Sequence, residues 1–251
     1  MKTKWLFNLL IAGFVSIVSC HTASNTLALT IQKKPDSPSD KYLKSLYSGI
    51  FDKLGVEIRF QHYPHKRANQ RLIHGDVDGD TSRVYEYGEW FPELIRVREP
   101  HYLGHVLAVT TDPDIDVSSL KKIQDGDYDI CYHRGSLIVE RKISELFDQS
   151  HFRAVSSTTF GLRTLNAKRC DLFIGVDNEL IGLLASDEFV GEKFYIRNSL
   201  YSYSAHMYLL PKYKELAENV SQELVEMRET GQLEQLQQQN GLNFYKSAKV
   251  E

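Results

Sequence analysis

The chain has 251 residues, of which 42% are hydrophobic and 25% are charged, and its formal net charge is −3 at pH 7. This composition is typical of a globular protein with one large or two modest domains and argues against long disorder and against a coiled coil. A slightly acidic chain without a Lys/Arg-rich stripe also lacks the basic surface of a nucleic-acid-binding protein, so we expect no nucleic-acid partner.

The N-terminus has the pattern of a targeting segment. Lys2 and Lys4 precede an apolar run, residues 5 to 18, that is too short and too interrupted for a transmembrane helix. We therefore expect residues 1–19 to be a signal peptide, cleaved near 19/20, and the mature protein to reside in the periplasm. The run Ile17-Val18-Ser19-Cys20 also resembles a lipobox. Cys20 is thus either a lipidated first residue that anchors the protein to a membrane or a neighbour of an ordinary cleavage site.

Two cysteines, Cys131 and Cys170, remain in the mature chain. They could form a disulfide in an oxidising compartment, but buried free cysteines are common and we expect both to be free. The chain has no Cys/His spacing typical of zinc, and its histidines fall on different predicted elements. We expect no metal and no cofactor.

The first part of the mature chain alternates strands and helices. The expected elements are a strand at 27–32, a helix from about 40 to 54, a strand at 56–63, a helix at 67–74 and a short strand that begins near Val77. Ser39 or Asp40 can cap the first helix, and Gly75 ends the second. This order predicts a largely parallel sheet, with polar residues at the end of the third strand.

The same plan returns after an irregular aromatic segment, residues 84 to 101. The expected elements are a strand at 103–111, a short helix that Ser118 or Ser119 caps, a strand at 128–133, a helix opened by Gly135 and Ser136, a strand at 152–156, a helix at 157–170, a strand at 172–176 and a helix from about 178 to 185. Extended chain at 194–210 leads to a C-terminal helical region interrupted near Gly231. We predict two lobes, one from 25–111 with 200–246 and the other from 112–199, and the chain crosses between them twice.

Motifs in a fixed order carry a family resemblance. They are the run Leu72 to Gly79, similar to the pattern Leu-x-x-Gly-x-x-Asp-Gly, then Arg83 just after that strand, Glu99 to Tyr102, Gly135 with Ser136, Asp171 to Asp177, and Gly231. Together they resemble the bacterial extracellular solute-binding proteins of family 3, over essentially the whole mature chain. The resemblance implies a type II periplasmic-binding fold, in which two α/β lobes, each a mostly parallel sheet flanked by helices, are joined by two crossing strands and hold a ligand between them.

Three side chains have the chemistry to bind an amino acid. Arg83 can hold a carboxylate with two parallel hydrogen bonds, and the helix start at Gly135 and Ser136 suits an anion. Asp177, at the end of a strand in the other lobe, suits an ammonium group. The resemblance implies that Arg83, Ser136 and Asp177 contact the α-carboxylate and the α-amino group. Alternatively, Arg83 forms a salt bridge, Ser136 is only a helix N-terminal residue, and Asp177 caps the helix that follows it.

The segment after the first strand departs from the family pattern. Residues 32 to 38 supply neither the aromatic shelf nor the Gly-Phe-Asp segment of the amino-acid binders, so the class of ligand stays open. Trp90 or Tyr102, or else Tyr85 or Tyr87, could form the shelf instead, although such aromatics more often pack in a core. His65 or Arg67 could also reach the cleft.

The sequence lacks a recognisable catalytic or calcium motif. Counted from Asp76, the positions where an EF-hand needs Gly and Glu hold Thr81 and Tyr87. We therefore expect no enzyme, and the family resemblance implies a monomeric binding protein that captures a small polar, amino-acid-like solute for an ABC importer. Two alternatives remain, namely a dehydratase-like enzyme on the same fold, with Glu99 or Asp80 as its acid or base, and a ligand-sensing accessory protein for a membrane signalling partner.

Overall fold

The computed structural model describes residues 26–196 and 199–242. The predicted signal peptide, its cleavage site and Cys20 lie outside the described residues. Within them, nine strands form one continuous hydrogen-bonded sheet in the order β2-β1-β3-β9-β5-β8-β6-β7, with β4 added beside β9. No helix in this part of the chain is long and apolar enough to span a membrane.

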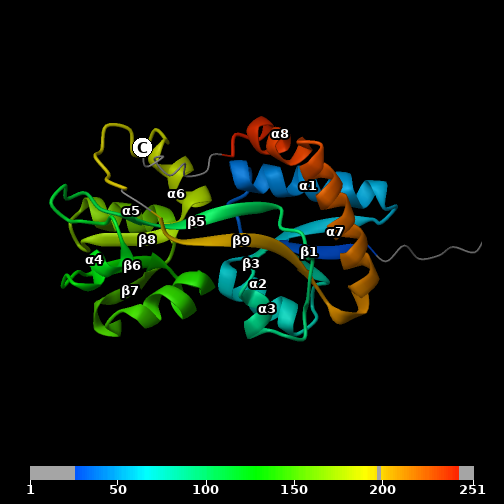
Figure 1. The fold of residues 1–251 in the computed structure, drawn as a ribbon, viewed down its shortest axis with the longest axis horizontal. Coiled ribbons are helices and arrows are strands. Elements are labelled where there is room, and N and C mark those ends of the chain that lie inside the picture. The colour runs from blue at the N-terminus through cyan, green and yellow to red at the C-terminus, as the bar shows by residue number, and fades with distance from the viewer. Residues whose placement is uncertain (1–25, 197–198, 243–251) are drawn as a thin grey trace, which may run out of the picture.

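The first lobe contains three parallel strands. They are β1 (Leu27–Ile31), β2 (Ile58–His62) and β3 (Gly79–Val84), and the helices between and after them are α1 (Pro38–Lys53), α2 (His65–Ile73) and α3 (Tyr87–Trp90). β1 pairs in parallel with both β2 and β3, as the alternation of strands and helices predicted. In this lobe α1 lies over one face of the sheet, and α2 and α3 lie over the other (Figure 1).

The second lobe repeats the arrangement. Its strands are β6 (Ile130–His133), β7 (Phe152–Val155) and β8 (Leu172–Val176), and its helices are α4 (Leu120–Gln124), α5 (Thr158–Asn166) and α6 (Asp177–Leu184). β6 is parallel to β7 and to β8. Cys131 and Cys170 are buried free thiols in the core of this lobe.

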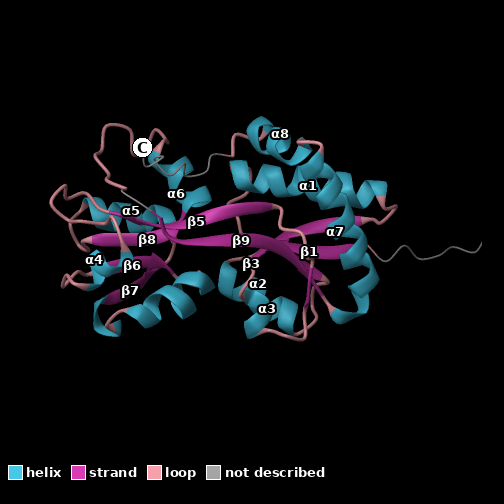
Figure 2. Cartoon of the chain, viewed as in Figure 1, coloured by secondary structure: helices cyan, strands magenta, loops and turns pink. Residues whose placement is uncertain are grey.

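Two long antiparallel strands join the lobes. β5 (Tyr102–Val109) and β9 (Ser199–Leu209) pair with each other from Tyr102 with Ala205 to Leu107 with Ser199. β9 also pairs with β3 and with the short strand β4 (Ile95–Arg96), and β5 also pairs with β8. Figure 2 shows both strands running across the middle of the molecule. The two expected crossings are therefore present, while the residue boundaries between the lobes stay a prediction.

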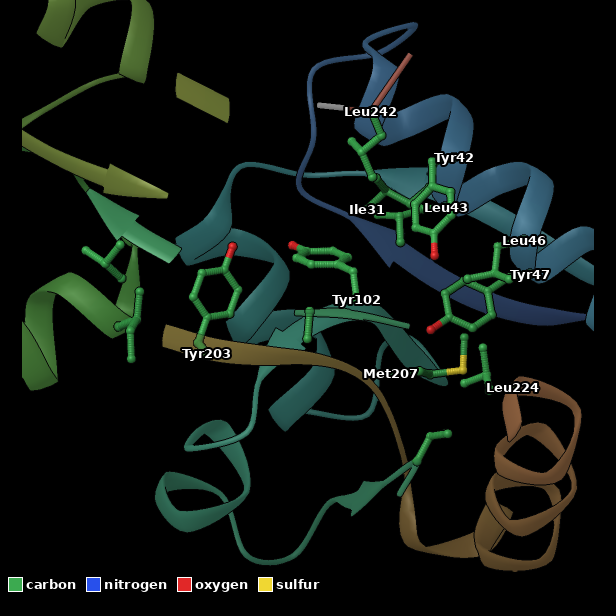
Figure 3. Close-up of a cluster of buried hydrophobic side chains, with 14 of the residues drawn as sticks. Ile31, Tyr42, Leu43, Leu46, Tyr47, Tyr102, Tyr203, Met207, Leu224 and Leu242 are labelled. Atoms are coloured by element: carbon green, nitrogen blue, oxygen red, sulfur yellow. The ribbon is translucent and has the colours of Figure 1, made fainter. Parts of the chain in front are cut away.

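The C-terminal helices return to the first lobe. A 3-10 turn (η4, Pro211–Tyr213) leads into α7 (Lys214–Glu229) and α8 (Gln232–Gln239), which contact α1. Gly231, with φ of 76°, makes the predicted interruption between them. Figure 3 shows the resulting core, in which Tyr47 of α1, Met207 of β9 and Leu224 of α7 meet.

Two local predictions were wrong. The cap of α1 is Ser37, whose side chain accepts a hydrogen bond from Asp40 N, because Pro38 has its φ preset for the first helical turn. Arg83 lies inside β3 and not after it. The parallel pairing of β3 with β1 does end at Asp80, but β9 continues the strand on the other side after a bulge between Asp80 and Arg83.

Gly79 lets these strands approach each other. A Cβ atom at this position would lie 2.5 Å from Leu209 Cδ2 and 2.8 Å from the Tyr208 carbonyl oxygen. Because a backbone atom cannot yield as a side chain can, this glycine fixes where β3 meets β9 and so where the following polar residues lie.

A buried histidine ties the first lobe together. His101 is fully buried, with Nδ1 at 2.9 Å from the Tyr47 hydroxyl and Nε2 at 3.2 Å from Ser82 Oγ. Burial is the main cause that holds the pKa of His101 well below its usual value, and the neighbouring groups His206, Lys33 and Arg228 act in the same direction. The ring is therefore neutral in the folded protein.

This histidine predicts acid sensitivity. Unfolding exposes the ring and restores an ordinary pKa of about 6.5, so the unfolded state binds more protons below that pH. We expect the free energy of unfolding to be highest above pH 6.5 and to fall below it, by up to about 1.4 kcal/mol per pH unit for one such group. Chemical denaturation at several pH values between 7 and 5 measures this change. The free energy of unfolding should fall less steeply with decreasing pH in His101→Gln than in the wild type. The exposed His74→Gln is the control, and equal slopes for His101→Gln and wild type would contradict the prediction.

Candidate ligand-binding cleft

The carboxyl ends of the parallel strands converge on one cavity between the lobes. Lys33 lies two residues after β1 and Arg83 lies in β3, while His133 ends β6 and Glu179 is in the first turn of α6 after β8. His65 of α2 completes this set of charged and imidazole side chains. The cavity has a volume of about 60 Å³, enough for a few water molecules. Open α/β sheets bind their ligands at this edge.

Arg83 is held by a buried carboxylate. Asp80 is fully buried and accepts hydrogen bonds from Thr30 Oγ1 at 2.9 Å and from Arg83 Nε at 2.8 Å. Arg83 itself is only 7% exposed, and its guanidinium carbon lies 4.8 Å from the centre of the Tyr87 ring. Its Nη2 also lies 2.8 Å from Asp80 Oδ2, yet this atom has no properly oriented hydrogen-bond partner among the described residues. The cleft thus contains a positioned cation that is ion-paired with Asp80 and whose Nη2 makes no oriented hydrogen bond among the described residues.

Glu179 is surrounded by donors from both lobes. Lys33 Nζ lies 3.1 Å from Oε1, and Thr158 Oγ1 donates to Oε2 at 2.8 Å. The side chains of His65 and His133 approach the same carboxylate to 3.9 Å and 3.8 Å. Their two rings meet edge to face, with centroids 5.0 Å apart. These contacts join the β1 loop and α2 of one lobe to β6, α5 and α6 of the other.

The ion pair at the centre of this cluster is charged on both sides. Burial opposes ionisation of each group, but the Lys33 ammonium, together with His133 and His65, holds the pKa of Glu179 well below its usual value. Burial lowers the pKa of Lys33, but the charge and hydrogen bond of Glu179, together with Tyr102, raise it above its usual value. Burial lowers the pKa of His65 to about 3, so this imidazole is neutral near pH 7.

Tyrosines close the cavity on the side of the crossing strands. Tyr102 of β5 and Tyr203 of β9 both line it, with ring centroids 6.2 Å apart, and project toward the same side of the sheet (Figure 3). Trp90 is not among the described lining residues. It lies on α3, where the Arg141 guanidinium carbon is 5.2 Å from the centre of its ring. Of the four candidate shelf residues, Tyr87 and Tyr102 line the cavity, whereas Trp90 and Tyr85 do not.

The segment after Gly135 and Ser136 is not the α-helix that the sequence predicted. Ser136 lines the cavity, but the chain continues as a π-helical turn (η1, Val139–Ile143) and a 3-10 turn (η2, Ser144–Leu146). Gly135 N donates to Glu140 Oε1 at 2.7 Å, and Ser136 N donates to the His133 carbonyl at 3.1 Å. Neither N–H group is therefore free to bind an anion, because Glu140 accepts from Gly135 and the His133 carbonyl accepts from Ser136. The role of the Ser136 hydroxyl as a ligand contact stays a prediction.

Asp177 lies beneath the cavity and not on its described lining. It is fully buried, and its Oδ1 accepts a hydrogen bond from Asn178 N at 2.8 Å in the first turn of α6. Glu99 and Asp80, the alternative acid or base groups, are not lining residues either. Glu99 pairs with Arg228, and Asp80 lies behind Arg83. Arg67 is exposed on α2.

Sequence reasoning missed Lys33, His133 and Glu179. Glu179 is two residues beyond Asp177, so the pattern of a strand followed by an acid was recognised but assigned to the wrong acid. Lys33 lies in the segment that departs from the family pattern. Its charge was the available signal, since a lysine just after the first parallel strand lies at the edge where a ligand would bind.

Comparison with solved structures identifies the fold. A histidine kinase sensor domain with similarity to periplasmic binding proteins has a TM-score of 0.74 at 16% identity, over 86% of this chain and 95% of that chain. The ligand-binding core of GluR0 with L-glutamate has a TM-score of 0.73 at 9% identity, over 88% and 100% of the two chains. The chain has the two-lobed periplasmic-binding fold.

Further comparisons agree with this fold. An amino acid ABC transporter substrate-binding protein from Streptococcus pneumoniae, bound to L-arginine, has a TM-score of 0.69 at 17% identity, over 86% of this chain and 94% of that chain. A Shewanella oneidensis protein of uncharacterised function is 28% identical over 204 residues, which are 81% of this chain and 77% of that protein. No family model matches the chain. The solved structures named here are of binding or sensing proteins rather than enzymes.

Proposed function

We propose that the chain is a periplasmic solute-binding protein that closes its two lobes on a small polar, amino-acid-like solute and delivers it to an ABC importer. The observation that carries this proposal is Arg83, a buried guanidinium on the cleft whose Nη2 has no oriented partner among the described residues. A carboxylate is the natural partner of such a group, because it accepts charge-assisted hydrogen bonds in the plane of the guanidinium. The neighbours that bind arginine and glutamate support the same class of solute.

The proposal requires the lobes to move. A cavity of about 60 Å³ is too small for an amino acid, and the side chains around it come from both lobes. Two crossing strands can act as a hinge between the lobes, and closure exchanges the hydration of the ligand for hydrogen bonds from Arg83, Ser136 and Ser82. A ligand that contacts both lobes stabilises the closed form by its differential affinity for that form.

Calorimetric titration tests this proposal. We expect the protein, freed of any co-purified ligand by reversible unfolding, to bind at least one amino acid or small carboxylate with saturable heat and one-to-one stoichiometry. Native mass spectrometry before that treatment should show the mass of the same solute on the protein. The absence of binding across a panel of amino acids and small carboxylic acids would contradict the proposal.

A sensing role is the second candidate, because a kinase sensor domain shares the fold over 86% of this chain. In that case the closed form would be recognised by a membrane signalling partner instead of a permease. Neighbouring genes for a permease and an ATPase would favour transport, and a neighbouring gene for a membrane receptor would favour sensing.

A further inference from the structure

The acceptor in the cleft is already satisfied by the protein. Both Glu179 oxygens have a hydrogen-bonding donor, Lys33 for one and Thr158 for the other, and the Lys33 side chain is only 8% exposed. Glu179 and Lys33 come from different lobes, so the ion pair spans the cleft. Each oxygen keeps a second lone pair, so an ammonium group on a ligand would reach Glu179 either by displacing this lysine or by lying beside it, where the two cations would repel each other.

The two cations that line the cleft, Arg83 and Lys33, differ from Glu179 because each has N–H groups without an oriented hydrogen-bond partner among the described residues. Arg83 is ion-paired with Asp80, but its buried Nη2 makes no oriented hydrogen bond among the described residues. Lys33 has three N–H bonds, of which one points to Glu179. A ligand carboxylate would therefore gain donors that the protein leaves available. The described lining thus offers a ligand carboxylate two cations, whereas a ligand ammonium would meet a single carboxylate that Lys33 already pairs with.

From this asymmetry we infer that Lys33 is a specificity-determining residue, which makes the cleft select carboxylates without an adjacent amine, such as 2-oxo acids, over the corresponding amino acids. The inference rests on the proposed function and narrows its substrate class. The physical reason is the cost of displacement. An incoming ammonium would regain the contact with Glu179 but leave the Lys33 ammonium buried without its counter-ion, and an uncompensated buried charge is strongly unfavourable. A keto oxygen carries no charge and leaves the ion pair in place.

Matched pairs of ligands test the inference on the wild-type protein. The pairs are pyruvate with L-alanine, 2-oxoglutarate with L-glutamate, and 2-oxoisocaproate with L-leucine, which differ only at the carbon next to the carboxylate. We expect the 2-oxo acid of the best-binding pair to bind at least about tenfold more tightly than its amino acid, since one hydrogen bond to a charged group has an effect of this size. An amino acid that binds as tightly as its 2-oxo acid would overturn the inference while leaving the proposed function in place. If no member of any pair binds, and no other amino acid or small carboxylate does, the proposed function fails as well.

Variants show whether Lys33 is the cause. In Lys33→Met the Glu179 carboxylate loses its partner and becomes available, so the preference should reverse in favour of the amino acid. Lys34→Met is the matched control, because this neighbouring lysine is exposed, and it should keep the wild-type preference. The double variant Lys33→Met/Glu179→Gln removes both charges, so it leaves no buried carboxylate without its cation and is less prone to a folding defect. It should bind the two members of a pair with similar affinity. A Lys33→Met or double variant that folds and keeps the wild-type preference refutes the role of Lys33.

Discussion

Replacing Arg83 by lysine should weaken solute binding by about 10- to 100-fold while the protein stays folded. Lysine keeps a positive charge beside Asp80, but its single ammonium cannot hold that carboxylate and a ligand carboxylate in one plane as a guanidinium can. Loss of a hydrogen bond between charged groups costs about 1.5–3 kcal/mol, which corresponds to this range of affinity. Calorimetric titration with the solute that the wild type binds measures the change.

The lysine variant is preferable to Arg83→Ala. Alanine would leave the fully buried Asp80 without its cation, so a loss of binding could reflect a loss of folding. Arg67→Lys is the matched control, because this exposed arginine of α2 does not line the cavity. Unchanged affinity in Arg83→Lys would remove Arg83 from the site and with it the main support for carboxylate binding.

The fold was predictable because its signals are local and repeated. The alternation of apolar strands with amphipathic helices was sufficient to predict both parallel units, and β8 has the predicted bounds, Leu172 to Val176. The details that failed depend on the partner strand. β3 extends past the end of its pairing with β1 only because β9, more than a hundred residues later in the chain, pairs with it as far as Val84. No local pattern in residues 77 to 84 contains that information.

The site was predictable only in part, for a related reason. Arg83 was predicted from its place after a strand, Ser136 from its place at a helix start, and Tyr102 as a candidate aromatic shelf. The structure places all three at the cavity. Asp177 was chosen over Glu179 because it follows β8 directly. At the start of α6, however, the first helical turn determines where each side chain points. The Asp177 side chain is buried in the core, whereas the Glu179 side chain contacts Lys33. Lys33 and Glu179 are 146 positions apart in the sequence, and a periodic pattern within one element cannot predict a contact at that separation.

Asp80 explains how the cleft keeps a buried cation in the absence of ligand. Its carboxylate is fully buried and accepts from the Arg83 guanidinium, from Thr30 and from Gln32. The same contacts anchor the end of β1 to β3, where the parallel pairing stops. Asp80 therefore sets the position of Arg83 and compensates its charge.

We expect Asp80→Asn to lower the free energy of unfolding by about 3–5 kcal/mol, because the amide keeps the shape of the side chain but leaves the buried guanidinium without a counter-ion. Asp76→Asn is the matched control in the same segment. Asp76 pairs with Arg71 at 3.3 Å, with both side chains nearly half exposed, and such a surface pair contributes at most about 1 kcal/mol. Urea denaturation measures both changes.

A double-mutant cycle separates the charge from the packing. In Asp80→Asn/Arg83→Met the unpaired cation is gone, so much of the stability lost in Asp80→Asn should return, although solute binding should not. A loss of less than about 1 kcal/mol in Asp80→Asn, as for a surface pair, would mean that water reaches Arg83 in solution. The guanidinium would then need no internal counter-ion, and the driving force for a ligand carboxylate would be correspondingly weaker, because a solvated cation gains little from a new partner.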